Sequence, residues 1–216
     1  MSEPAYTGFS RRQIVFLAGA GLLSGCGSIQ LIPQPMQPQL YVLRPQINPP
    51  MGATVQWRLS VAPPDAPASL DTARIALSRS PTTMDYFANA AWNDRVPLLV
   101  QRLLIQTFDA SNRIVAVDRD TAGSENDYLL ETEIRDFAAR YATPEGAPGI
   151  VVSIQAKLTS MPQRQIVSSL AVMQQAQASA NSLDSIVMAF DSATAAAIEQ
   201  IAAWTLNAPA PPASSG

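Results

Sequence analysis

Histidine is absent from this chain of 216 residues, and cysteine occurs only once. Histidine is the commonest general base near neutral pH and the commonest zinc ligand. Its absence excludes Ser-His-Asp and Cys-His hydrolysis, and no HExxH, P-loop or GxGxxG motif is present. The sequence therefore predicts a protein that is not an enzyme and that holds no metal and no cofactor.

Charge is also scarce, at 14% of residues with a formal net charge of −3. No basic cluster occurs, which argues against nucleic acid as a partner and against an electrostatic hold on anionic lipid head groups. Glu131 and Glu133 could form an acid/base pair, but they alternate with apolar residues. This alternation is typical of a strand with one solvated face.

The first 25 residues predict a lipoprotein signal peptide. A short polar start is followed by Arg11 and Arg12 and then by an apolar run over residues 13–23. The run is about half of the ~20 residues that span a bilayer, so it indicates a cleaved segment rather than a permanent anchor. The residues that end it resemble the lipobox read by lipoprotein signal peptidase. They are Leu23, Ser24, Gly25 and Cys26.

We predict that Cys26 is lipidated and becomes the first mature residue, although a buried free thiol is the alternative. Two or three acyl chains would anchor the protein stably to a membrane. Gly27 occupies the position of the aspartate that retains lipoproteins in the inner membrane, which favours the outer membrane, with the domain facing the periplasm. Residues 10–17 also resemble a twin-arginine signal, with Ile14-Val15 in place of the usual Phe-Leu. Sec and twin-arginine export both stay open.

Composition divides the mature chain into three parts. Residues 26–38 form a proline-rich segment, which predicts a stiff extended tether. Residues 39–206 carry the periodic apolar patterns of a folded domain. Residues 207–216 are alanine, proline and serine rich and predict a disordered tail.

The apolar periodicities predict an α+β fold, in which a mostly antiparallel sheet carries two amphipathic helices in a single domain. One helix opens near Pro97, and the other covers 183–204 with Asn181 or Ser182 as its N-cap. The apolar stripe of the second helix favours core packing over a lipid-binding surface. The expected strands are 40–43, 55–61, 74–77, 84–88, 114–117, 127–134, 150–158 and 165–173.

Two segments resemble the signature of the ABC-type transport auxiliary lipoproteins, the family that includes the lipoprotein of the paraquat-inducible Pqi system. They are Leu70-Asp71-Thr72-Ala73-Arg74-Ile75 and Met84-Asp85-Tyr86-Phe87-Ala88-Asn89-Ala90-Ala91-Trp92. Later landmarks of the family occur in the same order, and the resemblance covers roughly residues 40–206. The landmarks are Pro97, Leu98-Leu99, Asp127 to Leu130, Asp136-Phe137 and Trp204. The sequence departs from the pattern at Ala91, where the family often has arginine.

The resemblance implies a role in transport. Members act with an ABC permease, an ATPase and an MCE-domain protein, and these assemblies move phospholipid or other hydrophobic molecules across the envelope. This chain would be the docking or assembly component at the outer membrane, and a homo-oligomer is compatible with that role. Two alternatives stay open, namely a stand-alone periplasmic lipid carrier and a structural lipoprotein for outer-membrane assembly.

The signature region also supplies the candidate partner interface, since aromatic residues are enriched in interface cores. Ordinary packing of a hairpin is the alternative for its aromatic residues. Asp71, Arg74 and Asp85 are expected either to form ion pairs that fix this hairpin or to be solvated. The candidate interface residues are Arg74, Asp85, Tyr86, Phe87 and Trp92.

Overall fold

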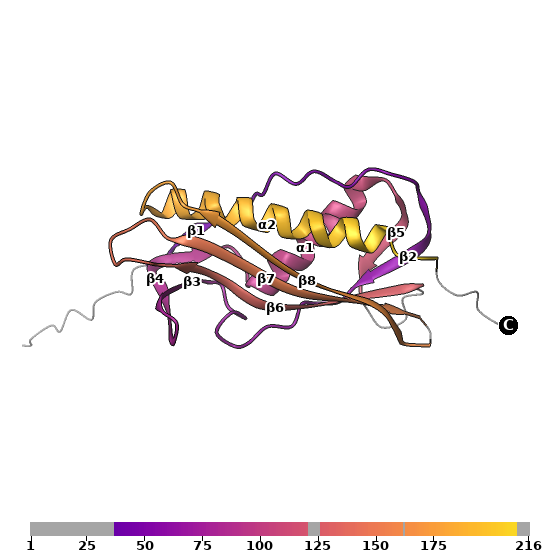
Figure 1. Ribbon diagram of the computed structural model, residues 1–216, viewed down its shortest axis with the longest axis horizontal. Helices are drawn as coiled ribbons and strands as arrows, with labels where there is room; N and C mark the ends of the chain where they lie inside the picture. Colours follow the sequence, from indigo (N-terminus) through magenta and orange to yellow (C-terminus); the bar gives the residue numbers. More distant parts are fainter. Residues whose placement is uncertain (1–36, 121–125, 162, 211–216) are drawn as a thin grey trace, which may run out of the picture. The chain divides into compact units, whose positions relative to one another are not determined.

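The computed structural model of the protein describes residues 37–120, 126–161 and 163–210 (Figure 1). The predicted signal peptide, the sequence from Leu23 to Cys26, the tether up to residue 36 and the last six residues lie outside these ranges. Predictions about them therefore stay predictions.

Eight strands and two helices follow one another in the described residues, and each predicted element is found. Six of the strands are longer than predicted. In β4 and β6 the predicted strand ends where a bulge interrupts the alternation, within residues 87–90 and at Arg135. The elements are β1 (Gln39–Tyr41), β2 (Val55–Val61), β3 (Arg74–Ser80), β4 (Thr83–Trp92), α1 (Val96–Ser111), β5 (Ile114–Arg119), β6 (Tyr128–Arg140), β7 (Gly149–Ser160), β8 (Gln165–Gln177) and α2 (Leu183–Leu206).

Strand β6 connects the two halves of the sheet. One of its edges pairs with β7 along the whole strand, and β7 pairs in turn with β8. The other edge of β6 is shared, because β2 pairs with its first residues and β3 pairs with its last residues. The loop between β2 and β3 follows the middle of this edge and forms a single bridge from Asp65 to Glu133.

The sheet is mixed, so the prediction of a mostly antiparallel sheet is wrong. The β3–β4 hairpin and the β6–β7–β8 meander are antiparallel. The β1–β4, β2–β5, β2–β6 and β3–β6 pairs are parallel. Parallel pairs join segments that are distant in sequence, and periodicity within one segment does not reveal its neighbour. The α+β class, the single domain and the two helices are confirmed.

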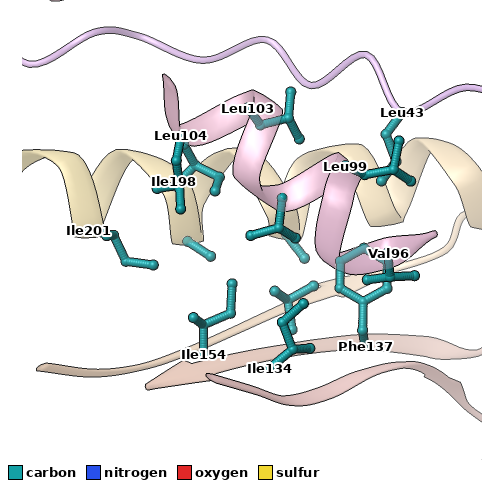
Figure 2. Close-up of a cluster of buried hydrophobic side chains, with 14 of the residues drawn as sticks. Leu43, Val96, Leu99, Leu103, Leu104, Ile134, Phe137, Ile154, Ile198 and Ile201 are labelled. Carbon is teal, nitrogen blue, oxygen red and sulfur yellow. The ribbon is translucent and has the colours of Figure 1, made fainter. Parts of the chain in front are cut away.

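The core lies between the sheet and the two helices. Figure 2 shows Ile134, Phe137 and Ile154 of the sheet beneath side chains of both helices. Helix α2 is long and apolar enough to cross a membrane, but most of it is buried inside this domain. Its apolar stripe packs on β7 and β8, as expected of a core helix. The helix residues labelled in Figure 2 are Val96, Leu99, Leu103, Leu104, Ile198 and Ile201.

Local signals fix the ends of both helices. Ser182 is the N-cap of α2, where its Oγ accepts a hydrogen bond from the Ser185 N–H at 3.4 Å. Asp184 lies in the first turn, where a negative charge is favourable. Helix α1 has a proline in its first turn and ends at Asn112, whose φ of 51° is left-handed.

Residues 42–54, here called the strap, run along α2 before β2 begins (Figure 1). The Arg44 N–H donates to Asp191 Oδ1 at 2.8 Å, and the Asn48 N–H donates to Glu199 Oε1 at 2.6 Å. From Arg44 to Asn48 the extended strap covers about 13 Å, and from Asp191 to Glu199 helix α2 covers about 12 Å. The strap and the helix therefore run side by side in the same direction. Leu43 is buried and points toward Leu99 of α1 (Figure 2).

Arg113 fastens the end of the strap to the end of α2. Its guanidinium is buried and donates to the carbonyl oxygens of Ala53, Met51 and Leu206 at 2.9, 3.2 and 3.3 Å. Gly52 has a φ of +145° and lies flat against this group, since a Cβ there would be 3.0 Å from Arg113 Cζ. Only glycine suits both the backbone angle and the space.

The start of the predicted tail is held against the domain. The Tyr128 hydroxyl donates to the Pro209 carbonyl at 2.8 Å, and Arg113 Nη2 lies 3.4 Å from Asn207 Oδ1. Residues 207–209 therefore contact the folded domain, and disorder of the tail stays a prediction.

Candidate partner-binding surface

The β3–β4 hairpin contains a large bulge at the centre of the signature region. Arg74 pairs with Ala91 and Ala76 pairs with Tyr86, so residues 87–90 of β4 lie opposite the single residue Ile75. Asn89 adopts a left-handed φ of 55°, a conformation that asparagine tolerates. Beyond the bulge β4 pairs with β1. Such bulges redirect side chains and often lie at functional sites.

Arg74 and Tyr86 form a stacked pair on the hairpin. The guanidinium carbon of Arg74 lies 3.6 Å from the centroid of the Tyr86 ring, within cation–π range. The Tyr86 hydroxyl donates to the Ser69 carbonyl at 3.1 Å, which ties the ring to the preceding loop. Arg74 is exposed and Tyr86 half-buried, so the pair presents a fixed cation to the surface.

Phe87 meets Tyr141 at the end of β6, with ring centroids 6.5 Å apart. The Arg79 guanidinium lies 5.4 Å from the Tyr141 ring centroid. Burial raises the pKa of the Tyr141 hydroxyl while Arg79 opposes that rise. No pattern in the sequence indicates that Tyr141 is a neighbour of the hairpin aromatics, because the parallel β3–β6 pairing brings it beside Arg79 and Phe87.

Trp92 is in the core. It is 1% exposed, and its ring packs edge-on against Phe137 and Phe190 at centroid distances of 6.2 and 5.2 Å. Trp92 therefore does not belong to a contact surface, and its part in the candidate interface is corrected to packing. The candidate surface that remains is Arg74, Asp85, Tyr86 and Phe87, here called the hairpin surface.

The acidic residues of this region divide between the two expected alternatives, an ion pair for Asp71 and a solvated side chain for Asp85. Both Nε and Nη2 of Arg95 donate to the Asp71 carboxylate in a bidentate ion pair, so the partner of Asp71 is Arg95 and not Arg74. Asp85 is exposed, and within the described ranges no ion pair involves it. Arg95 precedes α1, so the Asp71 pair fastens the loop before the hairpin to the start of that helix.

Two shallow grooves flank the strap. One is lined by Arg44, Met188 and Asp191, and the other by Val42, Arg102 and Gln106 among others. Burial raises the pKa of Asp191 above its ordinary value, and the hydrogen bond from the Arg44 N–H opposes this rise. Neither groove brings together the groups of a catalytic or metal site.

The paired carboxylates lie on a solvated face. Glu131 and Glu133 are exposed, and Glu133 pairs with Arg135 at 3.2 Å. Among residues 37–120, 126–161 and 163–210, no cluster of three metal-ligating side chains occurs.

The sequence of this domain matches a known family. The model of the ABC-type transport auxiliary lipoprotein component covers residues 40–202, from β1 through most of α2. The chain belongs to this family. The auxiliary lipoproteins are associated by name with the cell envelope and with ABC transport, and theirs is not a family of enzymes.

Solved structures share the fold of this auxiliary lipoprotein. Protein XCC0632 of Xanthomonas campestris has a TM-score of 0.73 and 25% identity, with 78% of this chain and 94% of that one covered. An uncharacterized protein has a TM-score of 0.62 at 18% identity, with 78% and 99% covered. A curated protein of Bradyrhizobium diazoefficiens is 29% identical over 198 residues, which is 89% of this chain and 50% of that protein. The chain thus spans about half the length of this relative.

Proposed function

We propose that this chain is the lipid-anchored auxiliary subunit of an ABC transport system with an MCE-domain protein, which it docks through the hairpin surface. The observation that carries this proposal is the family match over residues 40–202. The anchor would be the diacylglycerol on Cys26, and the membrane would be the outer membrane, with the domain in the periplasm. The cargo would be phospholipid or another hydrophobic molecule.

The hairpin surface suits docking because its groups are held in place without being buried. The Arg74 side chain rests on Tyr86, and Tyr86 is fixed through Ser69. A cation that is already ordered loses less entropy on binding than a free arginine does. Asp85 and Phe87 add an acceptor and an apolar ring beside it.

The observation that favoured the lipid-carrier alternative does not support it in the folded domain. It rested on the apolar face of the terminal helix, and that face is packed on β7 and β8. Residues such as Ile198 and Ile201 are fully buried there.

Photo-crosslinking in intact cells tests the docking. A crosslinking amino acid replaces Asp85 in the full-length chain, and the matched control replaces Val115, which is 55% exposed on β5. We expect the Asp85 site to capture an MCE-domain protein and the Val115 site not to do so. Capture of outer-membrane assembly factors alone at Asp85 would overturn the transport role.

A second experiment tests the anchor. Cys26→Ser should move the protein from the membrane fraction to the soluble fraction and abolish labelling by a fatty-acid analogue. Membrane association that persists unchanged in Cys26→Ser would contradict lipidation at this residue.

A further inference from the structure

Strand β8 forms a long open edge of the sheet. It pairs with β7 from Gln165 opposite Ser160 to Gln177 opposite Gly149, and no described strand lies on its other side. Its thirteen residues include no charge, no proline and no glycine. Ile166 and Met173 are 60% and 64% exposed. Natural sheets protect such edges with charges, prolines, bulges or a covering segment. Strand β8 has a bulge at Val167, near its start, and the ten residues after it pair regularly with β7.

Helix α2 continues this neutral surface in the second layer. Gln200 accepts a hydrogen bond from Gln174 of β8 at 2.8 Å, which identifies the flank of α2 beside that strand. At about 100° per residue, Ala196 and Ala203 lie within about 60° of Gln200 around the helix axis, on the side that faces away from the core. Asp191 lies on the opposite side of the helix and Glu199 on its outer face, and both accept hydrogen bonds from the strap. The β8 edge and this flank of α2 are here called the neutral edge.

We propose that the neutral edge pairs with the neutral edge of a second copy of this chain, with the two β8 strands antiparallel about a two-fold axis. A two-fold interface brings a surface against itself, so any charge on it risks meeting a like charge. Strand β8 presents none along its thirteen residues. Both layers would then continue from one copy into the next, as one sheet and one layer of helices.

The other sheet edges do not fit β8 equally well. Strand β5 has six residues and carries Asp118 and Arg119, and β1 has only three residues. A thirteen-residue uncharged edge finds a partner of the same length and chemistry in its own copy. The backbone N–H and C=O groups along β8 that β7 leaves unpaired would be paired over the whole strand.

The contact area is that of a stable dimer. Thirteen residues of antiparallel strand extend about 44 Å, and α2 extends about 36 Å. A strip of this length that includes both layers has an area of roughly 600–800 Å² on each copy, close to the ~800 Å² per partner of stable interfaces. The small side chains of Ala196 and Ala203 allow the two α2 helices to approach to the 8–10 Å typical of packed helices.

Crosslinking of the full-length chain in its native membrane tests the arrangement. Full overlap of the two strands places Ala171 on the axis, so the variant Ala171→Cys brings two thiols about 5 Å apart. A short bismaleimide should then yield a product of twice the mass. The controls are the wild type, whose one cysteine is Cys26, and Val115→Cys on the β5 edge. Equal dimer yield at Val115, or a product of Ala171→Cys with a different protein, would overturn the proposal.

Charge reversal supplies an independent measurement. In the same register Ser169 lies opposite Met173 of the second copy, so lysine at both positions places like charges face to face. We expect this double variant, and the matching double glutamate variant, to weaken dimerisation at least about tenfold in sedimentation equilibrium of the detergent-solubilised chain. Mixing the two variants should restore the dimer, while their melting temperatures stay near that of the wild type. A monomeric wild type, or a mass unchanged by either variant, would overturn the proposal.

Discussion

The two flanks of helix α2 differ in charge and in what covers them. One flank carries Asp191 and Glu199, and the strap covers it by donating backbone N–H groups to both carboxylates. The other flank carries alanine and glutamine beside β8, and no described segment covers it. Because buried or half-buried carboxylates need donors, the charged flank requires the strap. The neutral flank has no carboxylate that needs a hydrogen-bond donor, and it is open to contact with another molecule.

The core between these flanks gives the largest expected effect. Trp92 packs on Phe190, which lies on the core face of α2. Trp92→Ala should lower the free energy of unfolding by roughly 3–5 kcal/mol, because it removes a fully buried ring and leaves a cavity. Urea denaturation measures this loss. Phe87→Ala, at a half-buried site, should cost clearly less; equal losses would contradict the assignment of Trp92 to the core and Phe87 to the surface.

The next largest effect is expected at Arg113, which binds the end of the strap to the end of α2. Arg113→Met keeps much of the side-chain volume but leaves three carbonyl groups without their charged donor. We expect unfolding to become easier by roughly 2–3 kcal/mol, which is typical of buried hydrogen bonds to a charged group. Arg135→Met is the matched control, because its ion pair with Glu133 is exposed and should contribute less than about 0.5 kcal/mol. A loss in Arg113→Met no larger than in the control would show that the strap end is not fastened here.

The contrast between the flanks also shows what a sequence can and cannot reveal. Both helices, the β3–β4 hairpin and the β6–β7–β8 meander follow from local periodicity and turn residues, and the structure contains them. The prolines of the strap favour an extended backbone, but an extended segment can be free or docked. Docking depends on Asp191 and Glu199, which lie about 150 residues later in the chain.

The same reason limits the prediction of the candidate site. Arg74, Tyr86 and Phe87 can be chosen from the signature segment because they are close in sequence. Their neighbours Tyr141 and Ser69 become visible only once the parallel β3–β6 pairing and the loop before the hairpin are known. Trp92 was chosen for its residue type, and residue type alone does not distinguish a surface aromatic from a core aromatic.

A smaller effect should separate the flanks directly. Glu199→Ala removes the acceptor for both the Asn48 N–H and the Asn48 Nδ2. We expect a stability loss of about 1 kcal/mol and faster amide hydrogen exchange in the strap, with exchange in β8 unchanged. Glu199→Gln keeps an acceptor oxygen and should exchange nearly as the wild type does. Faster exchange in β8 to the same extent would mean that the two flanks are not independent.

The smallest effect concerns the charge of Asp191 and its dependence on pH. Burial raises the pKa of this carboxyl above its ordinary 3.8 in spite of the hydrogen bond from Arg44. The folded state therefore holds the proton more tightly than the unfolded chain does. The stability that this provides is complete below the unfolded pKa and is lost as the pH rises through the folded pKa.

Asp191→Asn has no such titration, and its amide oxygen still accepts from the Arg44 N–H. The variant should therefore gain stability relative to the wild type between about pH 3 and pH 7, by less than about 1 kcal/mol because the side chain is only half-buried. Urea denaturation of both proteins across this range measures the difference, and the other carboxyls cancel because both chains contain them. A difference that is constant with pH would mean that the strap, by donating to Asp191, fully offsets the cost of burying its charge.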